Sequence, residues 1–332
     1  MQSLATRARP KSFAEVVGQN TVISILSRQV ATKKFKHAYL FCGCSGSGKT
    51  TVARIMASEL NDGEGEPIEL DAATNNGVDS IRALGIEAQQ MPIDCNYKVM
   101  VIDECHNLSK AAWDSALKLI EEPPEHAIFI FCTTNPNKVP ETILSRLQRF
   151  DFKRVSADAI AGRLEFILQE LVKNVSYETL ALHRIAVLSR GNVRDAVRIL
   201  EKCLDATNNL TADTVDSLLG ICSIEKMVSL ENAMFNKDAK KCVEILNDFR
   251  ESCSDMKQVM GEIIEFAVDC ALYAKLHDIY PTDLPNELSG RLPTEYPKSR
   301  LFADRLIDMY KYADSANAYV LMKTVCMEMC DE

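Results

Sequence analysis

One eight-residue stretch of the chain has the composition and spacing of a phosphate-binding loop. Residues Gly43–Thr50 read GCSGSGKT and match the pattern G-x-x-x-x-G-K-[ST] at every position. Glycines let the backbone curl so that successive N–H groups point at phosphate oxygens. The lysine of this pattern reaches the outer phosphates, and the threonine hydroxyl ligates Mg²⁺. The stretch therefore predicts a nucleoside triphosphate site with bound Mg²⁺.

Polar residues suited to the same chemistry follow two apolar stretches further along. Asp103 and Glu104 come directly after Val99–Ile102, and Thr134 follows Ala127–Cys132. An aspartate at the tip of a buried strand can hold the Mg²⁺ that bridges the phosphates. A glutamate beside it can polarise an attacking water. Two acids in a turn would mean little alone, but together with the loop they predict nucleotide hydrolysis, with Thr134 beside the outermost phosphate.

Alternating strands and helices must position these residues. Apolar runs predict strands at 38–42, 67–71, 98–103, 127–132 and 149–153, and helical periodicity predicts helices at 20–31, 51–57, 77–91 and 109–121. We expect Asn20 and Ser109 to cap the first and last of these helices. Strands that alternate with helices form a parallel sheet covered on both faces. Beyond Lys153 the pattern becomes helical, with segments 157–173, 177–188 and 193–206 and further helices towards Cys330.

Charge and composition narrow the classes of function. The net charge is −9, but the first 155 residues hold 18 basic and 18 acidic side chains, whereas the remainder holds 20 and 29. A DNA-binding surface would therefore lie on the first half. No apolar run approaches the length of a membrane span, and the N-terminus lacks the apolar core of a signal peptide, which predicts a cytoplasmic protein without membrane contact. The twelve cysteines contain no C-x-x-C pair, so neither a zinc ribbon nor disulfides are expected.

Residues 4 to about 203 resemble the gamma/tau subunits of bacterial DNA polymerase III and, more distantly, the small subunits of replication factor C and phage clamp loaders. Besides the phosphate loop, the motifs that carry the resemblance are R-P-x-x-F-x-E-V-V-G-Q at Arg9–Gln19, H-A-Y-L-F at His37–Phe41, V-x-x-I-D-E-x-H-x-L-S at Val99–Ser109, T-T-N-P-x-K-x-P at Thr133–Pro140, I-L-S-R at Ile143–Arg146 and G-x-x-R-D-A at Gly191–Ala196. Residues past about 210 carry no motif of the family.

The resemblance implies an AAA+ P-loop NTPase. Its ATP-binding α/β domain, with a five-stranded parallel sheet, would span residues 1–154, a helical lid domain 155–208 and an all-helical collar domain, which mediates oligomerisation, 209–332. The family uses ATP and Mg²⁺ to open a ring-shaped sliding clamp and load it onto primer–template DNA during replication. Its implied partners are other clamp-loader subunits in a ring-like, pentameric assembly, the sliding clamp, primer–template DNA and, indirectly, the DNA polymerase.

The resemblance also implies a role for each matching residue. Thr134 would be the sensor beside the γ-phosphate, and Arg194 the lid arginine that touches ATP in the same subunit. Arg146 would be an arginine finger that reaches the ATP of a neighbouring subunit. The residues by themselves suggest only solvated charges for these arginines.

Arg82 and Lys110 would contact the DNA backbone, and the helix 78–91 would meet the clamp. The implied ATP-binding residues are Val16, Val17, Gly18, Gly43, Cys44, Ser45, Gly46, Ser47, Gly48, Lys49, Thr50, Thr51 and Arg194; Thr50 and Asp103 would bind Mg²⁺; and Glu104, Asp103, Lys49, Arg146 and Thr134 would be catalytic.

Some features depart from the family pattern. The gamma/tau subunits usually carry a four-cysteine zinc module before the second strand, where this chain has the short acidic turn Asn61–Glu66, so we predict no zinc. Leu147 replaces a cysteine after the finger, and the chain ends without the long tail of tau, which leaves open a compact version or a piece of a longer protein. Asp103–His106 also resembles a helicase D-E-x-H box, but the helical remainder provides no second α/β lobe.

Two alternatives to an active clamp-loader ATPase stay open. One is a stator, a non-hydrolysing scaffold subunit of the same assembly; stators tend to lose the phosphate loop or the acidic pair, and this chain keeps both. The other is a different AAA+ remodeller of DNA, such as a branch-migration or helicase-loading motor. Dependence of the ATPase activity on a clamp and primed DNA would separate the remodeller from the clamp loader.

Overall fold

The computed structural model of the chain describes residues 3–93, 95–253, 255–276, 292 and 296–331. The chain divides into two compact units. The first comprises Met1–Val172 with Leu188–Glu201, and the second comprises Lys173–Val187 with Lys202–Glu332. The predicted domain boundaries at 154/155 and 208/209 stay predictions.

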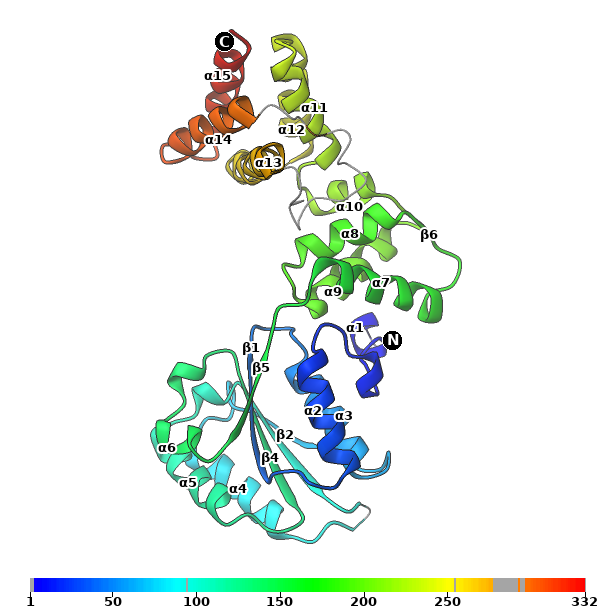
Figure 1. Cartoon of the computed structure of the whole chain (residues 1–332), viewed down its shortest axis with the longest axis vertical. Helices are drawn as coiled ribbons and strands as arrows, with labels where there is room; N and C mark the ends of the chain where they lie inside the picture. The colour runs from blue at the N-terminus through cyan, green and yellow to red at the C-terminus, as the bar shows by residue number, and fades with distance from the viewer. Residues whose placement is uncertain (1–2, 94, 254, 277–291, 293–295, 332) are drawn as a thin grey trace. The chain divides into compact units, whose positions relative to one another are not determined.

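A parallel five-stranded sheet forms the centre of the first unit (Figure 1), which confirms the expected α/β class. The strand order is β2-β3-β4-β1-β5, so β4 lies between the strand that leads into the phosphate loop and the strand that ends in the two acids. The carboxyl ends of all five strands therefore meet at one edge, where ligands of such sheets bind. The strands are β1 (Ala38–Gly43), β2 (Ile68–Asp71), β3 (Lys98–Asp103), β4 (Ala127–Thr133) and β5 (Gln148–Phe152).

Helices cover both faces of this sheet, and this explains why its central strands are apolar throughout. Tyr39 and Phe41 of β1 pack on the face that carries α2 (Asn20–Ala31) and α3 (Lys49–Leu60). Leu40 and Cys42 pack on the opposite face, which carries α4 (Val78–Gln89), α5 (Lys110–Glu121) and α6 (Glu141–Leu144) (Figure 1). The two faces thus bury alternate residues of the central strands β1, β3 and β4.

The two predicted helix caps have different outcomes. Ser109 caps α5 as expected, since its Oγ accepts a hydrogen bond of 3.2 Å from the Ala112 backbone N–H. The prediction for Asn20 was wrong: Asn20 is already the first residue of α2, and Gln19 occupies the cap position without a side-chain capping bond. The side chain of Gln19 is instead hydrogen-bonded to two distant carbonyl groups, as described below.

Short N-terminal elements, α7 and the first part of α9 also belong to the first unit. The N-terminal part holds α1 (Leu4–Arg7) and the 3₁₀ turn η1 (Phe13–Glu15). Helix α7 (Ala157–Leu171) follows the sheet, and α9 (Val193–Ala206) begins in the first unit and ends in the second. Further 3₁₀ turns follow β3, at Cys105–Asn107, and β4, at Pro136–Lys138.

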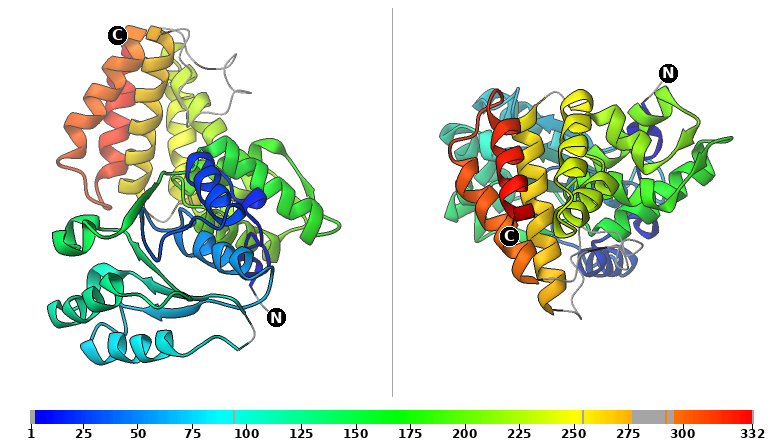
Figure 2. Two further views of the ribbon diagram at one scale, coloured as in Figure 1. Left: turned by 60° about the horizontal axis from the view of Figure 1, so that its bottom comes forward. Right: turned by 90° about the horizontal axis from the view of Figure 1, so that it is seen from above.

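The second unit is largely helical. Figure 2 shows α13, α14 and α15 side by side, and their apolar faces share one core with α11 and α12. A two-residue parallel pair of strands, β6 (Ser176–Tyr177) and β7 (Asn209–Leu210), was not predicted, because such short strands have no periodicity to read. No helix among the described residues is both long enough and apolar enough to span a bilayer. Besides the end of α9, the described residues of this unit form the helices α8 (Thr179–Leu188), α10 (Ala212–Leu219), α11 (Ile224–Phe235), α12 (Ala239–Ser252), α13 (Met256–Leu276), α14 (Tyr296–Tyr310) and α15 (Ala318–Asp331).

Candidate functional site

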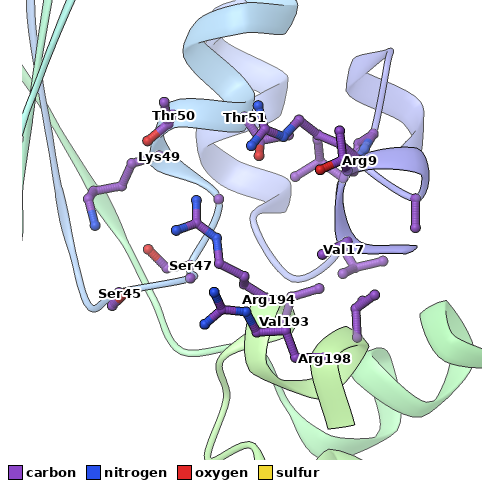
Figure 3. A pocket seen from close by; sticks show the side chains of 18 of the residues that line it. Arg9, Val17, Ser45, Ser47, Lys49, Thr50, Thr51, Val193, Arg194 and Arg198 are labelled. Atoms are coloured by element: carbon purple, nitrogen blue, oxygen red, sulfur yellow. The ribbon is translucent and has the colours of Figure 1, made fainter. Parts of the chain in front are cut away.

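A pocket of about 360 Å³ in the first unit contains most of the predicted site residues (Figure 3). The N-terminal segment, the phosphate loop, the tip of β3 and the first turns of α9 all contribute to it. Its lining residues are Ser3, Ala5, Thr6, Ala8, Arg9, Pro10, Val16, Val17, Ser45, Gly46, Ser47, Gly48, Lys49, Thr50, Thr51, Asp103, Glu104, Val193, Arg194, Val197 and Arg198.

The phosphate loop has the backbone conformation that its glycines allow. Gly46 (φ +68°) and Gly48 (φ +102°) both lie in the left-handed region, and α3 begins directly after them at Lys49. The Lys49 side chain is 5% exposed, and its Nζ donates to the carbonyl groups of Gly43 (2.9 Å) and Cys44 (3.0 Å). A concave loop at a helix N-terminus, with an ammonium group beside it, is suited to bind phosphates.

A hydroxyl and a carboxylate lie together at the start of α3. Thr50 Oγ1 donates a hydrogen bond of 2.7 Å to Asp103 Oδ2, and the other carboxylate oxygen accepts from the Glu104 backbone N–H at 2.9 Å. Mg²⁺ prefers oxygen ligands, and one or two protein groups together with substrate phosphates are its usual set. The pair Thr50–Asp103 fits this ion.

Glu104 has an unusual backbone conformation for a residue with a side chain. Its φ of +46° and ψ of +41° lie in the left-handed region, which costs roughly 1–3 kcal/mol for a non-glycine residue. Its Oε2 accepts a hydrogen bond of 3.1 Å from Thr134 and lies 3.3 Å from His106 Nδ1. The conformation turns the carboxylate towards the tip of β4, where a polar side chain can hold it.

Gln19 connects the phosphate loop to the end of the sheet. Its Nε2 donates to the backbone carbonyls of Ser47 (3.2 Å) and Lys153 (2.7 Å), and its Oε1 accepts from the Lys153 backbone N–H (3.1 Å). The side chain is 3% exposed, so these bonds satisfy an amide that is otherwise desolvated. Gln19 therefore fixes the position of the loop against β5.

Three arginines, Arg9, Arg194 and Arg198, line the pocket. Burial lowers the pKa of Arg9, and the neighbouring positive charges of Arg54 and Arg194 lower this pKa further. Figure 3 shows the Arg9 side chain extending towards Thr51. An anionic ligand would offset the repulsion between positive charges that lie in one pocket.

Helix α9 supplies the remaining wall. Val193 and Val197 give it an apolar surface, and Figure 3 shows Arg194 and Arg198 reaching from the helix towards the loop that holds Ser47. The helix starts very close to this loop, because Asn192 lies against Gly46. A β-carbon built on Gly46 would lie 1.6 Å from Asn192 Oδ1.

Val16 and Val17 line the N-terminal side of the pocket, where the resemblance places adenine. Gly18 follows them with a φ of +75°, and a β-carbon there would lie 2.8 Å from Val155 Cγ1. Gly18 does not line the pocket itself, so its place in the site is to let the chain turn closely past Val155.

The remaining predicted residues lie away from the pocket of their own chain. Arg146 follows α6 with 41% of its side chain exposed, and it bonds to the Thr142 carbonyl (2.7 Å) and Glu121 Oε1 (2.8 Å). Arg82 on α4 and Lys110 at the start of α5 are both exposed. No group of three or more metal-ligating His, Cys, Asp or Glu side chains occurs within the described part of the chain, and the prediction of a zinc-free protein stays a prediction.

Several residues in or beside the pocket have no role in the sequence-based prediction. Arg9 and Gln19 belong to the R-P-x-x-F-x-E-V-V-G-Q motif. The motif marks both residues, but the resemblance assigns no role to either. Arg198 comes four residues after Arg194, and this spacing places both side chains on one face of a helix. Asn192 lies inside the G-x-x-R-D-A motif, but only the fold shows its approach to Gly46.

Comparisons of the sequence with known proteins give one consistent family. A family model described as "DNA polymerase III, delta subunit" matches residues 64–156. DNA polymerase III subunit tau of Bacillus subtilis is 34% identical over 324 residues, which cover 89% of this chain and 57% of that protein. DNA polymerase III subunit gamma of Buchnera aphidicola (subspecies Baizongia pistaciae) is 32% identical over 284 residues, which cover 79% of this chain and 76% of that protein. The match to the tau subunit of Escherichia coli covers 42% of that protein, so the chain spans about half the length of the tau relatives.

Solved structures agree on the fold. The RuvB Holliday junction branch migration motor of Thermotoga maritima matches with a TM-score of 0.55 and 23% identity, over 68% of this chain and 79% of that chain. At this identity the likeness concerns the AAA+ fold alone.

Proposed function

Because the chain belongs to the DNA polymerase III gamma/tau family, we propose that it is an ATP-driven clamp-loader subunit that opens a sliding clamp and loads it onto primer–template DNA. The observation that carries this proposal is that the phosphate loop, the pair Asp103–Glu104 and Arg194 line the same pocket. Its partners would be other clamp-loader subunits in a ring-like, pentameric assembly, the clamp, the DNA and, indirectly, the polymerase. It would act in the cytoplasm at the replication fork.

The residues of the pocket divide the work of hydrolysis. The loop backbone and Lys49 bind the phosphates, and Thr50 with Asp103 would hold Mg²⁺, which when bound neutralises charge on the phosphates. Glu104 accepts a proton from the attacking water, and the Thr134 hydroxyl orients its carboxylate across 3.1 Å. Lys49 leaves its two loop carbonyl partners when it turns to the phosphates.

Arginines would supply the remaining positive charge. Arg194, which lines the pocket, would contact ATP in the same subunit. Arg146 lies outside this pocket on a half-exposed loop, which suits a residue that acts on the ATP of a neighbour. Arg82 and Lys110, exposed on α4 and α5, would contact the DNA backbone, and α4 would meet the clamp.

ATP turnover by the chain with its partner subunits tests the proposal. We expect turnover to rise when both the cognate clamp and a primer–template are added. Lys49→Ala should abolish nucleotide binding, because the loop loses its cation. Glu104→Gln should bind ATP and assemble, yet turn over ATP slowly, since only activation of water is lost.

Each alternative function has its own outcome in this experiment. A stator would bind nucleotide or partners without turnover under any combination of clamp and DNA. Another AAA+ remodeller would hydrolyse ATP at a rate that the clamp does not change. Either result would contradict a clamp-loader ATPase and support the corresponding alternative.

A further inference from the structure

Two stretches of the N-terminal segment, residues 3–17, line one side of the pocket. Ala8, Arg9 and Pro10 belong to the first stretch, and Val16 and Val17 to the second. Only the short elements α1 and η1 give this segment regular structure. Elements this short cannot hold their position alone, so the shape of this wall depends on contacts with the rest of the unit.

Polar contacts join the segment to the lid helices α7 and α9. Arg7 Nη2 donates to the Leu171 carbonyl at the end of α7 (3.1 Å), and the Leu4 backbone N–H donates to Glu201 of α9. Arg163 of α7 makes the most extensive contact. Its Nη2 donates to the Ala8 carbonyl at 2.9 Å and lies 3.5 Å from Glu15 Oε2.

Arg163 thus contacts both stretches of the wall at once, because Ala8 belongs to the first stretch and Glu15 directly precedes Val16. The arginine is 7% exposed, and its guanidinium also lies 4.9 Å from the centre of the Phe166 ring. A buried guanidinium keeps its charge only with partners that replace water. Burial lowers the pKa of Arg163, and the Glu15 carboxylate opposes this effect. The charge therefore binds the two stretches to α7 more firmly than a neutral side chain could.

The wall that Arg163 holds would face the nucleoside and not the phosphates. The phosphates would bind to the loop residues 45–51, which include Lys49, as the pattern requires. Away from the phosphate loop, Val16 and Val17 of this segment and Val193 and Val197 of α9 give the pocket an apolar surface. Apolar side chains on the two sides of a pocket suit the faces of a flat base.

We propose that Arg163 is a positioning residue for the base: by holding Ala8 and Glu15 on α7, it keeps the N-terminal segment in the shape that binds the nucleoside part of the ligand. This inference rests on the proposal that the pocket binds ATP. It places Arg163 outside direct contact with the ligand, since Arg163 does not line the pocket.

Calorimetric titration of the full chain with ATP, ADP and inorganic tripolyphosphate tests the role of Arg163. Arg163→Gln should weaken ATP and ADP binding about tenfold, as expected for loss of a charged hydrogen bond that shapes a site. Tripolyphosphate affinity should stay within about twofold, because the loop is untouched. Arg28→Gln, an exposed arginine of α2 away from the pocket, is the matched control and should change none of the affinities.

A second variant tests the same contact in case Arg163→Gln fails to fold. Glu15→Gln changes the carboxylate partner of Arg163, whose side chain is more accessible than the arginine, with 34% of it exposed. This variant should also weaken ATP binding. Together with Arg163→Gln the loss should be less than additive, since both changes break one contact. Equal losses for ATP and tripolyphosphate, or unchanged ATP binding in Arg163→Gln, would overturn the positioning role. Failure of the unaltered chain to bind ATP would instead overturn the proposed function.

Discussion

Thr134, directly after β4, donates a hydrogen bond of 3.1 Å to Oε2 of Glu104, directly after β3. The same oxygen lies 3.3 Å from His106 Nδ1, which in turn lies 3.1 Å from Thr133 Oγ1. The tip of β4 therefore holds the glutamate carboxylate, which the left-handed backbone of Glu104 directs towards it. Because β4 lies between β1 and β3, this contact joins the two candidate catalytic residues beside the phosphate loop.

Removal of the Thr134 hydroxyl should slow hydrolysis without weakening ATP binding. Thr134→Val keeps the shape of the side chain but cannot orient Glu104, so kcat should fall by roughly tenfold or more, while the dissociation constant for ATP should stay within about twofold. Single-turnover kinetics and equilibrium titration measure the two quantities. Thr134→Ser, which keeps the hydroxyl, should retain most of the rate. An unchanged kcat in Thr134→Val would show that the contact plays no part in catalysis.

Gly46→Ala should weaken nucleotide binding through a collision with Asn192, which directly precedes α9. The new β-carbon would lie 1.6 Å from Asn192 Oδ1, and the left-handed φ adds about 1–2 kcal/mol of strain. Asn192 cannot easily move away, because its Oδ1 accepts from the Asp195 backbone N–H (3.2 Å) at the start of α9.

Two further variants test this explanation by ATP titration. Gly46→Ala combined with Asn192→Ser, a shorter residue that can still cap the helix, should recover part of the affinity. Gly77→Ala should have little effect, because its β-carbon meets nothing within 4 Å. If the serine restores nothing, the strain at Gly46 and not the contact with Asn192 explains the loss.

The second unit should lose stability as the pH rises, because of the buried residue Glu231. Burial raises the pKa of Glu231 from 4.5 to about 7, against smaller opposing effects of Cys270 and Ser299. The folded state therefore favours the protonated carboxyl: the stabilisation is complete below about pH 4.5 and is lost as the pH rises through 7. The loss is on the order of 3 kcal/mol when the shift is converted directly.

Denaturant unfolding at pH 5 and pH 8 measures the effect of Glu231. Glu231→Gln, which stays neutral, should lose less stability between these values than the unaltered chain. Burial also raises the pKa of Asp216, to about 6, in the same unit, so the comparison with Glu231→Gln isolates one group. Glu244→Gln on the exposed side of α12 serves as the control. Identical pH dependence in Glu231→Gln and the unaltered chain would contradict the prediction.

Local sequence patterns were sufficient to predict the sheet and the positions of its polar tips. The predicted strand 98–103 matches β3, and the predicted strand 127–132 ends one residue before β4 does, since a buried strand must be apolar and the residue after it need not be. The parallel order then brings Thr50 and Asp103 within 2.7 Å, although 53 residues separate them.

Long-range polar contacts could not be predicted in the same way. Gln19 bonds to Lys153 across 134 residues, and Arg163 bonds to Ala8 across 155. Neither pair has a periodic pattern, because each depends on how a loop or the helix α7 meets the N-terminal segment after folding. The error at Asn20 has the same cause, since Gln19 at the cap position uses its side chain for distant carbonyls.

Arg82→Ala and Lys110→Ala should weaken DNA binding by the assembled complex equally for all sequences. Both side chains are exposed, and the ion pair of Arg82 with Asp79 (3.4 Å) lies in water, where it contributes little. Loss of a phosphate contact lowers the slope of log K against log salt by about one per contact. Titration of primer–template DNA at several salt concentrations measures this slope, with Arg28→Ala as the control. A loss that depends on DNA sequence would indicate contacts with bases instead.

Arg146→Ala should separate a shared active site from a self-contained one. The guanidinium bonds to Thr142 and Glu121, next to its own loop and outside the pocket of its own chain. If it completes the site of a neighbour, the isolated monomer should be a poor ATPase despite its intact loop, Asp103 and Glu104. In the full complex Arg146→Ala should bind ATP normally and lose turnover by on the order of 10³–10⁵, the effect of fingers that act between subunits.

Mixing of variants decides which subunit each residue serves. A subunit with Arg146→Ala keeps its own loop and glutamate, so a neighbour that carries an intact arginine should restore hydrolysis at the site of the altered subunit. A subunit with Glu104→Gln lacks the base in its own pocket, and no neighbour can supply it. Turnover of mixed complexes, measured at a fixed total concentration and varied proportions, should therefore respond differently to the two variants. Rapid hydrolysis by monomers that does not depend on concentration, and that Arg146→Ala leaves unchanged, would reduce Arg146 to a surface charge and remove the case for a shared active site.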